Sequence, residues 1–167
     1  MKVDQKSAIK ILKNGGVIGI PTDTVYGFAS LKEYSDKIYE IKKRDKNKKL
    51  ITMINSIDYF DNLDSFLLES MKLNWPGSTT YIFDYNNEMT SFRIPDEINL
   101  LNLLNELGCG ILTTSANISG NEPCLTSFEF ENTFPDVPLL EESIYTIKSG
   151  TPSTILLYNN NVLEKIR

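Results

Sequence analysis

The alternation of helical segments and short apolar strands is the feature that most restricts the fold of this chain. A helical segment at residues 7–13 is stopped by Gly15 and followed by an apolar strand at residues 17–20. A second helix, which begins near Asp36, precedes a second strand at residues 50–54. Strands that alternate with helices predict an α/β fold.

Hairpins in the middle and at the end of the chain predict a mixed sheet. Residues 79–83 and 90–94 flank an Asn-Asn turn, and three further asparagines at residues 159–161 separate the last two strands. The predicted fold class is a single α/β domain over residues 1–167 with an open, twisted, mixed sheet. The other expected elements are helices at residues 64–73 and 96–107, strands at residues 111–114, 144–147, 153–158 and 162–166, and a surface loop at residues 126–140.

The absence of histidine excludes whole classes of catalytic site. A Ser-His-Asp triad needs an imidazole, and so does a zinc site built from cysteine and histidine, so we expect no structural metal. Cys109 and Cys124 have no paired spacing, and we interpret both as packing residues in a reducing compartment. Because the sequence shows neither a membrane-length apolar run nor a signal-peptide pattern, we expect a cytoplasmic protein without membrane contact.

A local cluster of cations would be needed to bind an anion, because the whole chain carries a net charge of −5. Residues 42–49 read KKRDKNKK and contain six cations. They form either the solvated end of a helix or an anion clamp, in which Arg44 supplies a bidentate fork. Lys42 and Arg44 are two positions apart, so both can hold one ligand only if the helix ends near Lys43.

Polar loops adjoin three of the expected strands. Residues 21–27 (PTDTVYG) and 113–120 (TTSANISG) each follow a strand, where ligands of α/β proteins bind, and residues 150–154 (GTPST) precede one. Their hydroxyl, amide and glycine groups suit a small polar ligand or a phosphate, whereas capping and Asx turns explain the same residues without a ligand. Arg93, in an alternating strand, either binds a substrate carboxylate or forms a surface ion pair. Neither a Walker A string nor G-x-G-x-x-G is present, so a nucleotide would need an uncommon cradle.

Taken together and in order, these segments resemble the YrdC-domain family of threonylcarbamoyl-AMP synthases. The matching strings are GGVIGIPTDTVYG, IKKR, WPG, FRIPD, TTSANISG and GTPSTILL, which extend from residue 15 to residue 157. The chain length is similar to that of the short bacterial form, which lacks the extra C-terminal domain of longer relatives. The resemblance implies an open, twisted α/β sheet with a concave and mostly positive cavity.

The family's activity, by this resemblance, is to make threonylcarbamoyl-AMP and pyrophosphate from threonine, bicarbonate and ATP. Threonine and bicarbonate form a carbamate, whose carboxylate attacks the α-phosphate of ATP. ATP is implied as its Mg²⁺ complex, and the product is implied to serve a downstream threonylcarbamoyl-transferase complex that modifies tRNA. Such chemistry needs positioning and charge neutralisation and no imidazole.

The family motifs assign roles to three groups of residues. Lys42 and Arg44 match the K-x-R pair and are the expected catalytic residues, on the phosphates and the carboxylated amine. The nucleotide is expected on these two residues and on Ser115, Ala116, Asn117 and Arg167, where the first three form the S-x-N turn. Threonine is expected on Thr22, Thr24, Tyr26, Arg93, Ser153 and Thr154.

Several positions depart from the family's pattern. Asp45 and Lys49 stand where many members have proline, Ser78 replaces the second proline of W-P-G-P, and Met53 or a neighbour replaces a histidine. These departures affect the threonine contacts more than the nucleotide site. Two alternatives stay open. One is a YrdC-type paralogue in another carbamoyl-transfer pathway. The other is a module that binds tRNA or double-stranded RNA, against which the net charge of −5 argues.

Overall fold

Ten strands form one open sheet in the computed structural model, which describes residues 1–167. The strands are β1 (Lys2–Val3), β2 (Ile18–Ile20), β3 (Gly27–Ser30), β4 (Ile51–Met53), β5 (Thr79–Tyr85), β6 (Glu88–Arg93), β7 (Ile111–Ser115), β8 (Leu139–Leu140), β9 (Thr154–Asn159) and β10 (Val162–Lys165). The helices are α1 (Gln5–Lys13), α2 (Asp36–Lys42), α3 (Ser65–Asn74), α4 (Ile98–Leu107) and α5 (Ser127–Thr133), with short 3-10 turns at Lys32–Tyr34 and Ile57–Tyr59. None of the helices combines the length and the apolar character that crossing a membrane requires.

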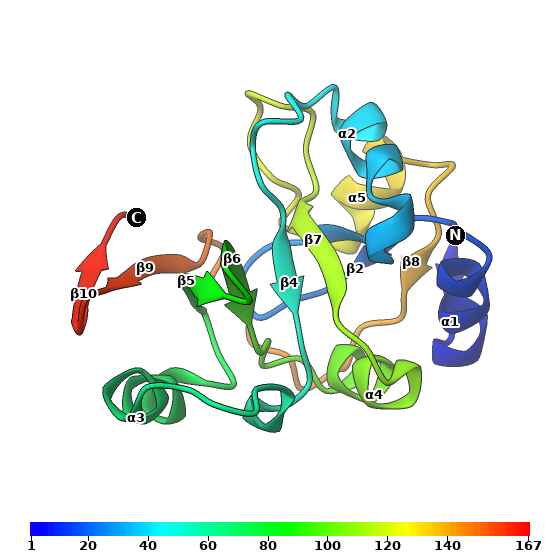
Figure 1. The fold of residues 1–167 in the computed structure, drawn as a ribbon. Coiled ribbons are helices and arrows are strands. Elements are labelled where there is room, and N and C mark those ends of the chain that lie inside the picture. The colour runs from blue at the N-terminus through cyan, green and yellow to red at the C-terminus, as the bar shows by residue number, and fades with distance from the viewer.

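The sheet mixes parallel and antiparallel pairs, which confirms the predicted fold class. Its strand order is β1-β8-β2-β3-β7-β4-β6-β5-β9-β10. The pairs β1–β8, β2–β8, β4–β6 and β5–β9 are parallel, and the remaining pairs are antiparallel. Figure 1 shows that β9 and β10 run across the direction of β4 and β7, as the accumulated twist of a long sheet produces. The first and last strands form opposite edges of the sheet.

Capping residues set the ends of the helices next to the polar loops. α4 begins at Glu97, whose side chain accepts a hydrogen bond from the helix backbone, and ends at Gly108 in the left-handed conformation. α2 ends at Lys43, which is also left-handed, with φ of 51°. The helix therefore ends near Lys43, which is the condition for Lys42 and Arg44 to approach the same region.

Three apolar clusters hold the helices on the sheet. α1 and α4 pack on β2 and β7 in the first cluster, which includes Leu12 and Leu103. Phe28 of β3 and Phe130 of α5 belong to the second cluster, and Met71 of α3 packs with aromatic residues of β5 and β6 in the third. Each large apolar side chain buried in this way contributes about 1.5–3 kcal/mol. Strand side chains that point away from these clusters are available for a binding site.

One segment expected as a surface loop is partly regular. Residues 126–140 contain α5 and β8, and α5 begins with a capping box, in which Thr126 and Glu129 each accept from the other's backbone N–H. Phe130 of α5 and Phe134, which follows the helix, pack in the second apolar cluster, so this part of the segment belongs to the core. Of the two cysteines expected to be packing residues, Cys124 is buried, whereas Cys109 is exposed.

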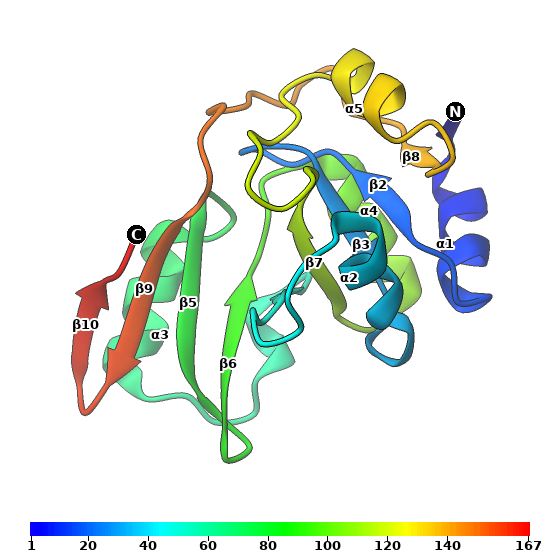
Figure 2. The ribbon, with the colours of Figure 1, turned by 90° about the horizontal axis from the view of Figure 1, so that it is seen from above.

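The chain between β8 and β9, residues 141–153, crosses the sheet and is called the strap below. β8 lies beside β2 and β9 lies beside β5, on the two halves of the sheet, and Figure 2 shows the strap passing α5 on its way between them. Residues 144–147, expected as a strand, lie in the strap and pair with no strand. A crossing segment has no strand neighbour, so the apolar side chains of Ile144, Tyr145 and Ile147 are 83–89% exposed.

Candidate functional site

A cavity of about 250 Å³ lies where the loop after β2 and the end of β7 meet the strands β4, β5 and β6. Strand alternation supplies its wall, because Ser91 and Arg93 of β6 line it, whereas Phe92 between them joins an apolar cluster. No carboxylate is among the lining residues, so the cavity is positive although the whole chain is negative. The lining cations are Arg44, Lys49, Arg93 and Arg167, and the aliphatic hydroxyls belong to Thr22, Thr24, Thr80, Ser91, Thr113, Thr114, Ser115 and Ser153.

The hydroxyl groups of the loop after β2 have a fixed hydrogen-bond direction. Thr22 Oγ1 donates its only proton to the carbonyl oxygen of Val25 (2.6 Å). The contact between Thr22 Oγ1 and Thr24 Oγ1 (2.8 Å) must therefore be donated by Thr24. Thr24 Oγ1 itself accepts from Arg93 Nη1 at 2.9 Å. Thr24 Oγ1 can thus bind a ligand only as an acceptor, through its remaining lone pair. Its own proton is donated to Thr22 Oγ1, which fixes its orientation.

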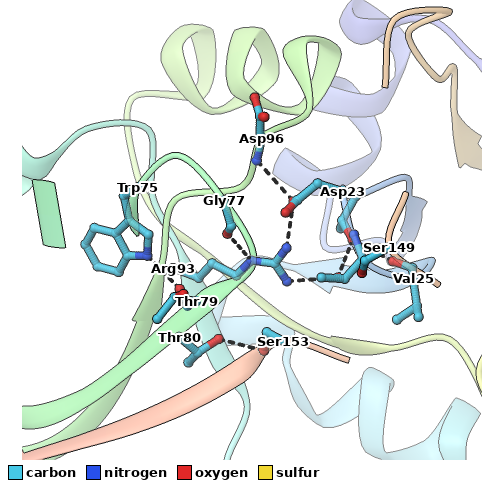
Figure 3. A network of polar contacts seen from close by, with 12 residues as sticks. Asp23, Val25, Trp75, Gly77, Thr79, Thr80, Arg93, Asp96, Ser149 and Ser153 are labelled. Carbon is cyan, nitrogen blue, oxygen red and sulfur yellow. Dashed lines mark hydrogen bonds and ion pairs between the residues drawn. The ribbon is translucent and has the colours of Figure 1, made fainter. Parts of the chain in front are cut away.

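The guanidinium of Arg93 is the centre of the polar network in Figure 3. It is 3% exposed and donates to Gly77 O (2.9 Å), Thr24 Oγ1 (2.9 Å) and Asp23 Oδ1 (2.6 Å). The same oxygen of Asp23 accepts from the backbone N–H of Asp96 (3.1 Å). Burial lowers the pKa of Arg93, and the Asp23 carboxylate opposes that shift, so the cation is retained. Since arginine has five N–H donors, two remain for the cavity.

Lys42 is buried and holds the turn after β7 from inside. Its ammonium donates to the carbonyl oxygen of Ser115, to the carbonyl oxygen of Asn117 (2.9 Å) and to Asn117 Oδ1 (2.7 Å). Three acceptors use all three of its N–H groups. Burial and the neighbouring Arg44 lower the pKa of Lys42 to about 8, so it is still charged at neutral pH. Lys42 reaches the predicted S-x-N turn, but as an internal support.

The turn itself is bonded within the protein. Asn117 Oδ1 also accepts from Ser115 Oγ (2.7 Å), and the Asn117 amide nitrogen donates to two carbonyl oxygens. The backbone N–H of Ala116 donates to Tyr26 O (2.7 Å), so it is not available to a phosphate. Of the three residues of the turn, only Ser115 lines the cavity. This network holds the turn rigidly in place next to the loop after β2.

Two further arginines reach the cavity from distant parts of the chain. Arg44 donates to the carbonyl oxygens of Lys48 (3.3 Å) and Lys49 (3.2 Å), which shapes the cation-rich loop after α2. Arg167 donates to Ser153 O (3.0 Å) and to Ser153 Oγ (3.2 Å) beside β9. Partial burial lowers the pKa of both arginines. The cavity therefore has one cation from the loop after α2 and another from the chain after β10, which lies against Ser153.

The phenol of Tyr26 is engaged by the strap. Tyr26 is buried, and its hydroxyl donates to Glu142 Oε2 (2.5 Å). Burial and the adjacent Glu142 raise the pKa of this phenol. Lys148 pairs with Glu142, and its Nζ lies 3.7 Å from the centre of the Tyr26 ring. Tyr26 thus lines the cavity with a hydroxyl that already has a partner.

The structure brings together most of the predicted site residues and separates four from the cavity lining. Lys42, Ala116, Asn117 and Thr154 are not among the lining residues, whereas all the other predicted residues are. Contacts with a nucleotide or with threonine stay predictions for every one of them. The lining also contains polar residues for which the sequence predicted no role, chiefly Thr80 and Ser91. Their alternation with apolar neighbours along the strands is the signal that could have found them.

The arrangement suits a ligand with a highly charged end and a small polar end. Arg44, Lys49 and Arg167 can neutralise several anionic oxygens, as a triphosphate presents. The Thr24 acceptor and the Ser153 hydroxyl lie in the same cavity and can recognise an ammonium or hydroxyl group. The site holds no imidazole and no free carboxylate, so its residues can bind and orient charge.

Comparisons with known proteins identify the family of this chain. The family model Sua5/YciO/YrdC, described as telomere recombination, matches residues 10–167. An uncharacterized protein of Mycoplasma genitalium is 32% identical over 173 residues, which cover 99% of this chain and 35% of that protein. A threonylcarbamoyl-AMP synthase of Vibrio campbellii is 28% identical over 150 residues, which cover 78% of this chain and 81% of the relative. The chain thus spans about a third of the Mycoplasma protein and most of the Vibrio one.

A solved structure has the same fold over the whole chain. The crystal structure of Sua5 from P. abyssi in complex with L-threonine is similar at a TM-score of 0.89 with 20% sequence identity. The similarity covers 100% of this chain and 56% of that one. The family match extends over residues 10–167, and the fold agrees with it. The chain belongs to the Sua5/YciO/YrdC family.

Proposed function

We propose that this chain is a threonylcarbamoyl-AMP synthase, which converts threonine, bicarbonate and ATP into threonylcarbamoyl-AMP and pyrophosphate. The observation that carries the proposal is the cavity itself, in which four cations and no carboxylate face a loop of oriented hydroxyls. Relatives of this chain bear the name threonylcarbamoyl-AMP synthase, and a structure of the same fold is a complex with L-threonine. These likenesses support the assignment of substrates.

The triphosphate of ATP would lie on the cations of the cavity. Arg44, Lys49 and Arg167 would neutralise its oxygens, and the rigid turn at Ser115 would fix its position. Mg²⁺ would arrive as part of the ATP complex, because the lining offers no carboxylate to hold an ion by itself. Lys42 would act through the turn, which it supports with three hydrogen bonds.

Threonine would bind beside the loop after β2. Thr24 Oγ1 has one lone pair left, so it would accept a hydrogen bond from the ammonium or the hydroxyl of threonine. The amino group of threonine and bicarbonate form a carbamate with loss of water, and an oxygen of this carbamate attacks the α-phosphorus. The bond from the α-phosphorus to the bridging oxygen breaks, and pyrophosphate leaves. The product would then serve a threonylcarbamoyl-transferase complex that modifies tRNA.

A pyrophosphate-release assay tests the proposed reaction. The protein should release pyrophosphate from ATP only when threonine, bicarbonate and Mg²⁺ are all present, and mass spectrometry should find threonylcarbamoyl-AMP. Omitting each component in turn provides the controls. Release that needs ATP but neither threonine nor bicarbonate would contradict the proposal and favour a YrdC-type paralogue with another substrate.

Substrate analogues should rank in the order threonine, serine, valine. Serine lacks one methyl group, which lowers kcat/KM by roughly 10- to 200-fold, equal to about 1–3 kcal/mol. Valine lacks the hydroxyl, so it leaves polar groups of the site unpaired and should lose on the order of 10⁴-fold, close to background. Initial rates of pyrophosphate release at several concentrations of each amino acid give the ranking. Equal rates with valine and serine would show that the site reads shape alone.

A further inference from the structure

Glu97 is a buried carboxylate that serves two segments at once. It is 1% exposed and is the N-cap of α4, where its Oε2 accepts from the backbone N–H of Leu100 (2.5 Å). Its other oxygen, Oε1, accepts from the strap, through the backbone N–H of Ser143 (2.9 Å) and the hydroxyl of Thr146 (3.0 Å). One side chain thus joins the beginning of a core helix to the middle of the crossing segment.

The strap in turn is bonded to the loop that carries the hydroxyls of the cavity. The backbone N–H of Ser149 donates to Asp23 O (2.9 Å), as Figure 3 shows, and that of Gly150 donates to Thr24 O (3.1 Å). The backbone N–H of Asp96, the residue before Glu97, donates to the side chain of Asp23. The start of α4, the strap and the hydroxyl loop therefore form one connected unit.

We propose that Glu97 is a positioning residue for the amino-acid substrate: it holds the strap, and the strap fixes the loop that presents Thr24. The inference rests on the proposed function, since it takes threonine as the ligand of that loop. Capping alone does not account for a buried glutamate. Asp64 caps α3, which has the same length as α4, and Asp64 is exposed. One of its oxygens accepts from two backbone N–H groups of that helix. Glu97 instead commits one oxygen entirely to the strap.

Polar anchors rather than apolar packing fix the strap. Besides Glu97, the pair of Glu142 and Lys148 binds Tyr26. The apolar side chains at the centre of the strap, such as Tyr145, are exposed and contribute no burial to hold it. Because conformational entropy favours a loose segment of this length, removal of an anchor should release it.

The first experiment compares Glu97→Ala with Asp64→Ala, which remove the caps of two ten-residue helices. Both substitutions should lower the unfolding midpoint, since each removes an N-cap. Only Glu97→Ala should also raise the KM for threonine, by about tenfold or more, with a smaller change of kcat at saturating threonine. In Glu97→Ala the KM for ATP should change less than the KM for threonine, because Arg44 and Lys49 lie on another segment and Arg167 contacts the strap only at its last residue, Ser153. Equal KM values for threonine in the two variants would overturn the proposal.

A second pair of variants separates the strap contact from the helix cap. Thr146→Val removes the hydroxyl that Glu97 accepts and leaves the cap intact, whereas Thr146→Ser keeps the hydroxyl. Thr146→Val should raise the KM for threonine, whereas the KM of Thr146→Ser should equal that of the wild type. Tyr145→Ser is the matched control, because Tyr145 lies on the same strap but is exposed to solvent, and this variant should leave the KM for threonine unchanged.

Hydrogen exchange tests whether Glu97 holds the strap, independently of the proposed synthase activity. The amides of Ser149 and Gly150 should exchange about tenfold faster in Glu97→Ala and Thr146→Val than in the wild type, but not in Asp64→Ala. A wild type that releases no pyrophosphate would reject the synthase, and the exchange rates would still decide whether Glu97 holds the strap. Unchanged exchange at both amides in Glu97→Ala would reject the positioning role, whatever the activity.

Discussion

Replacing Asp23 by alanine is expected to lower the free energy of unfolding by about 3–5 kcal/mol. The substitution leaves the guanidinium of Arg93 without its carboxylate partner at a position that is 3% exposed. Arg93 already lies among other cations of the cavity, so no other group compensates its charge. The backbone N–H of Asp96 loses its acceptor as well. Urea unfolding followed by circular dichroism measures the change.

Two further variants show whether the buried charge is the cause. Glu88→Ala breaks the ion pair with Lys49, in which both side chains are more than 60% exposed, and should cost only about 0.2–1 kcal/mol. The double variant Asp23→Ala with Arg93→Met removes both buried charges and should regain part of the stability lost in Asp23→Ala. If Asp23→Ala costs no more than Glu88→Ala, the pair is not the support of the site that its geometry indicates.

Replacing Lys42 by methionine should reduce pyrophosphate release by about a hundredfold, even though Lys42 does not line the cavity. The methionine fills the same space but removes the ammonium that donates to the carbonyl oxygens of Ser115 and Asn117, whereas Asn117 Oδ1 keeps the hydrogen bond from Ser115 Oγ. Buried unpaired acceptors cost about 1–3 kcal/mol each, so the turn at Ser115 should change its conformation, and small displacements in a site can cost about two orders of magnitude. Initial rates at saturating ATP and threonine measure the loss.

Lys48→Met provides the matched control, because Lys48 is an exposed cation of the loop after α2, whereas Lys42 is the buried last residue of that helix. It removes an equal charge without removing an internal hydrogen-bond donor, so its rate should stay within about threefold of the wild type. A similar loss in both variants would mean that the loop acts through its charge alone. A wild-type rate in Lys42→Met would show that the turn does not depend on Lys42.

Local signals in the sequence predicted those parts of the fold that local physics decides. Gly108 ends α4 in the left-handed conformation, and the asparagine pairs at 86–87 and 160–161 take positive φ in the turns where they were expected. The alternation of Phe92 and Arg93 also placed one side chain in the core and the other at the cavity. In each case the deciding interactions lie within a few residues of one another.

Other features depend on partners that are far away in the sequence. Asn117, which Lys42 contacts, is 75 positions further along the chain, and Ser143, which Glu97 contacts, is 46 positions away. Hydrophobic periodicity at residues 144–147 predicted a strand, but strand formation needs a neighbouring strand, and the crossing of the strap provides none. The capping box formed by Thr126 and Glu129 is a local sequence signal that indicates the start of α5.

The chain is negative as a whole and positive at its cavity, so the approach of a polyanion to the cavity depends on ionic strength. In dilute buffer the net charge of −5 extends its repulsion far beyond the surface, and an approaching nucleotide is slowed. At physiological ionic strength the Debye length shrinks to about 8 Å, so a nucleotide at the entrance experiences mainly the arginines and the lysine of the cavity. Much higher salt then screens these cations too. If the cavity binds a nucleotide as proposed, binding should be fastest at intermediate ionic strength, where salt screens the net negative charge of the whole chain more than the nearby cations of the cavity.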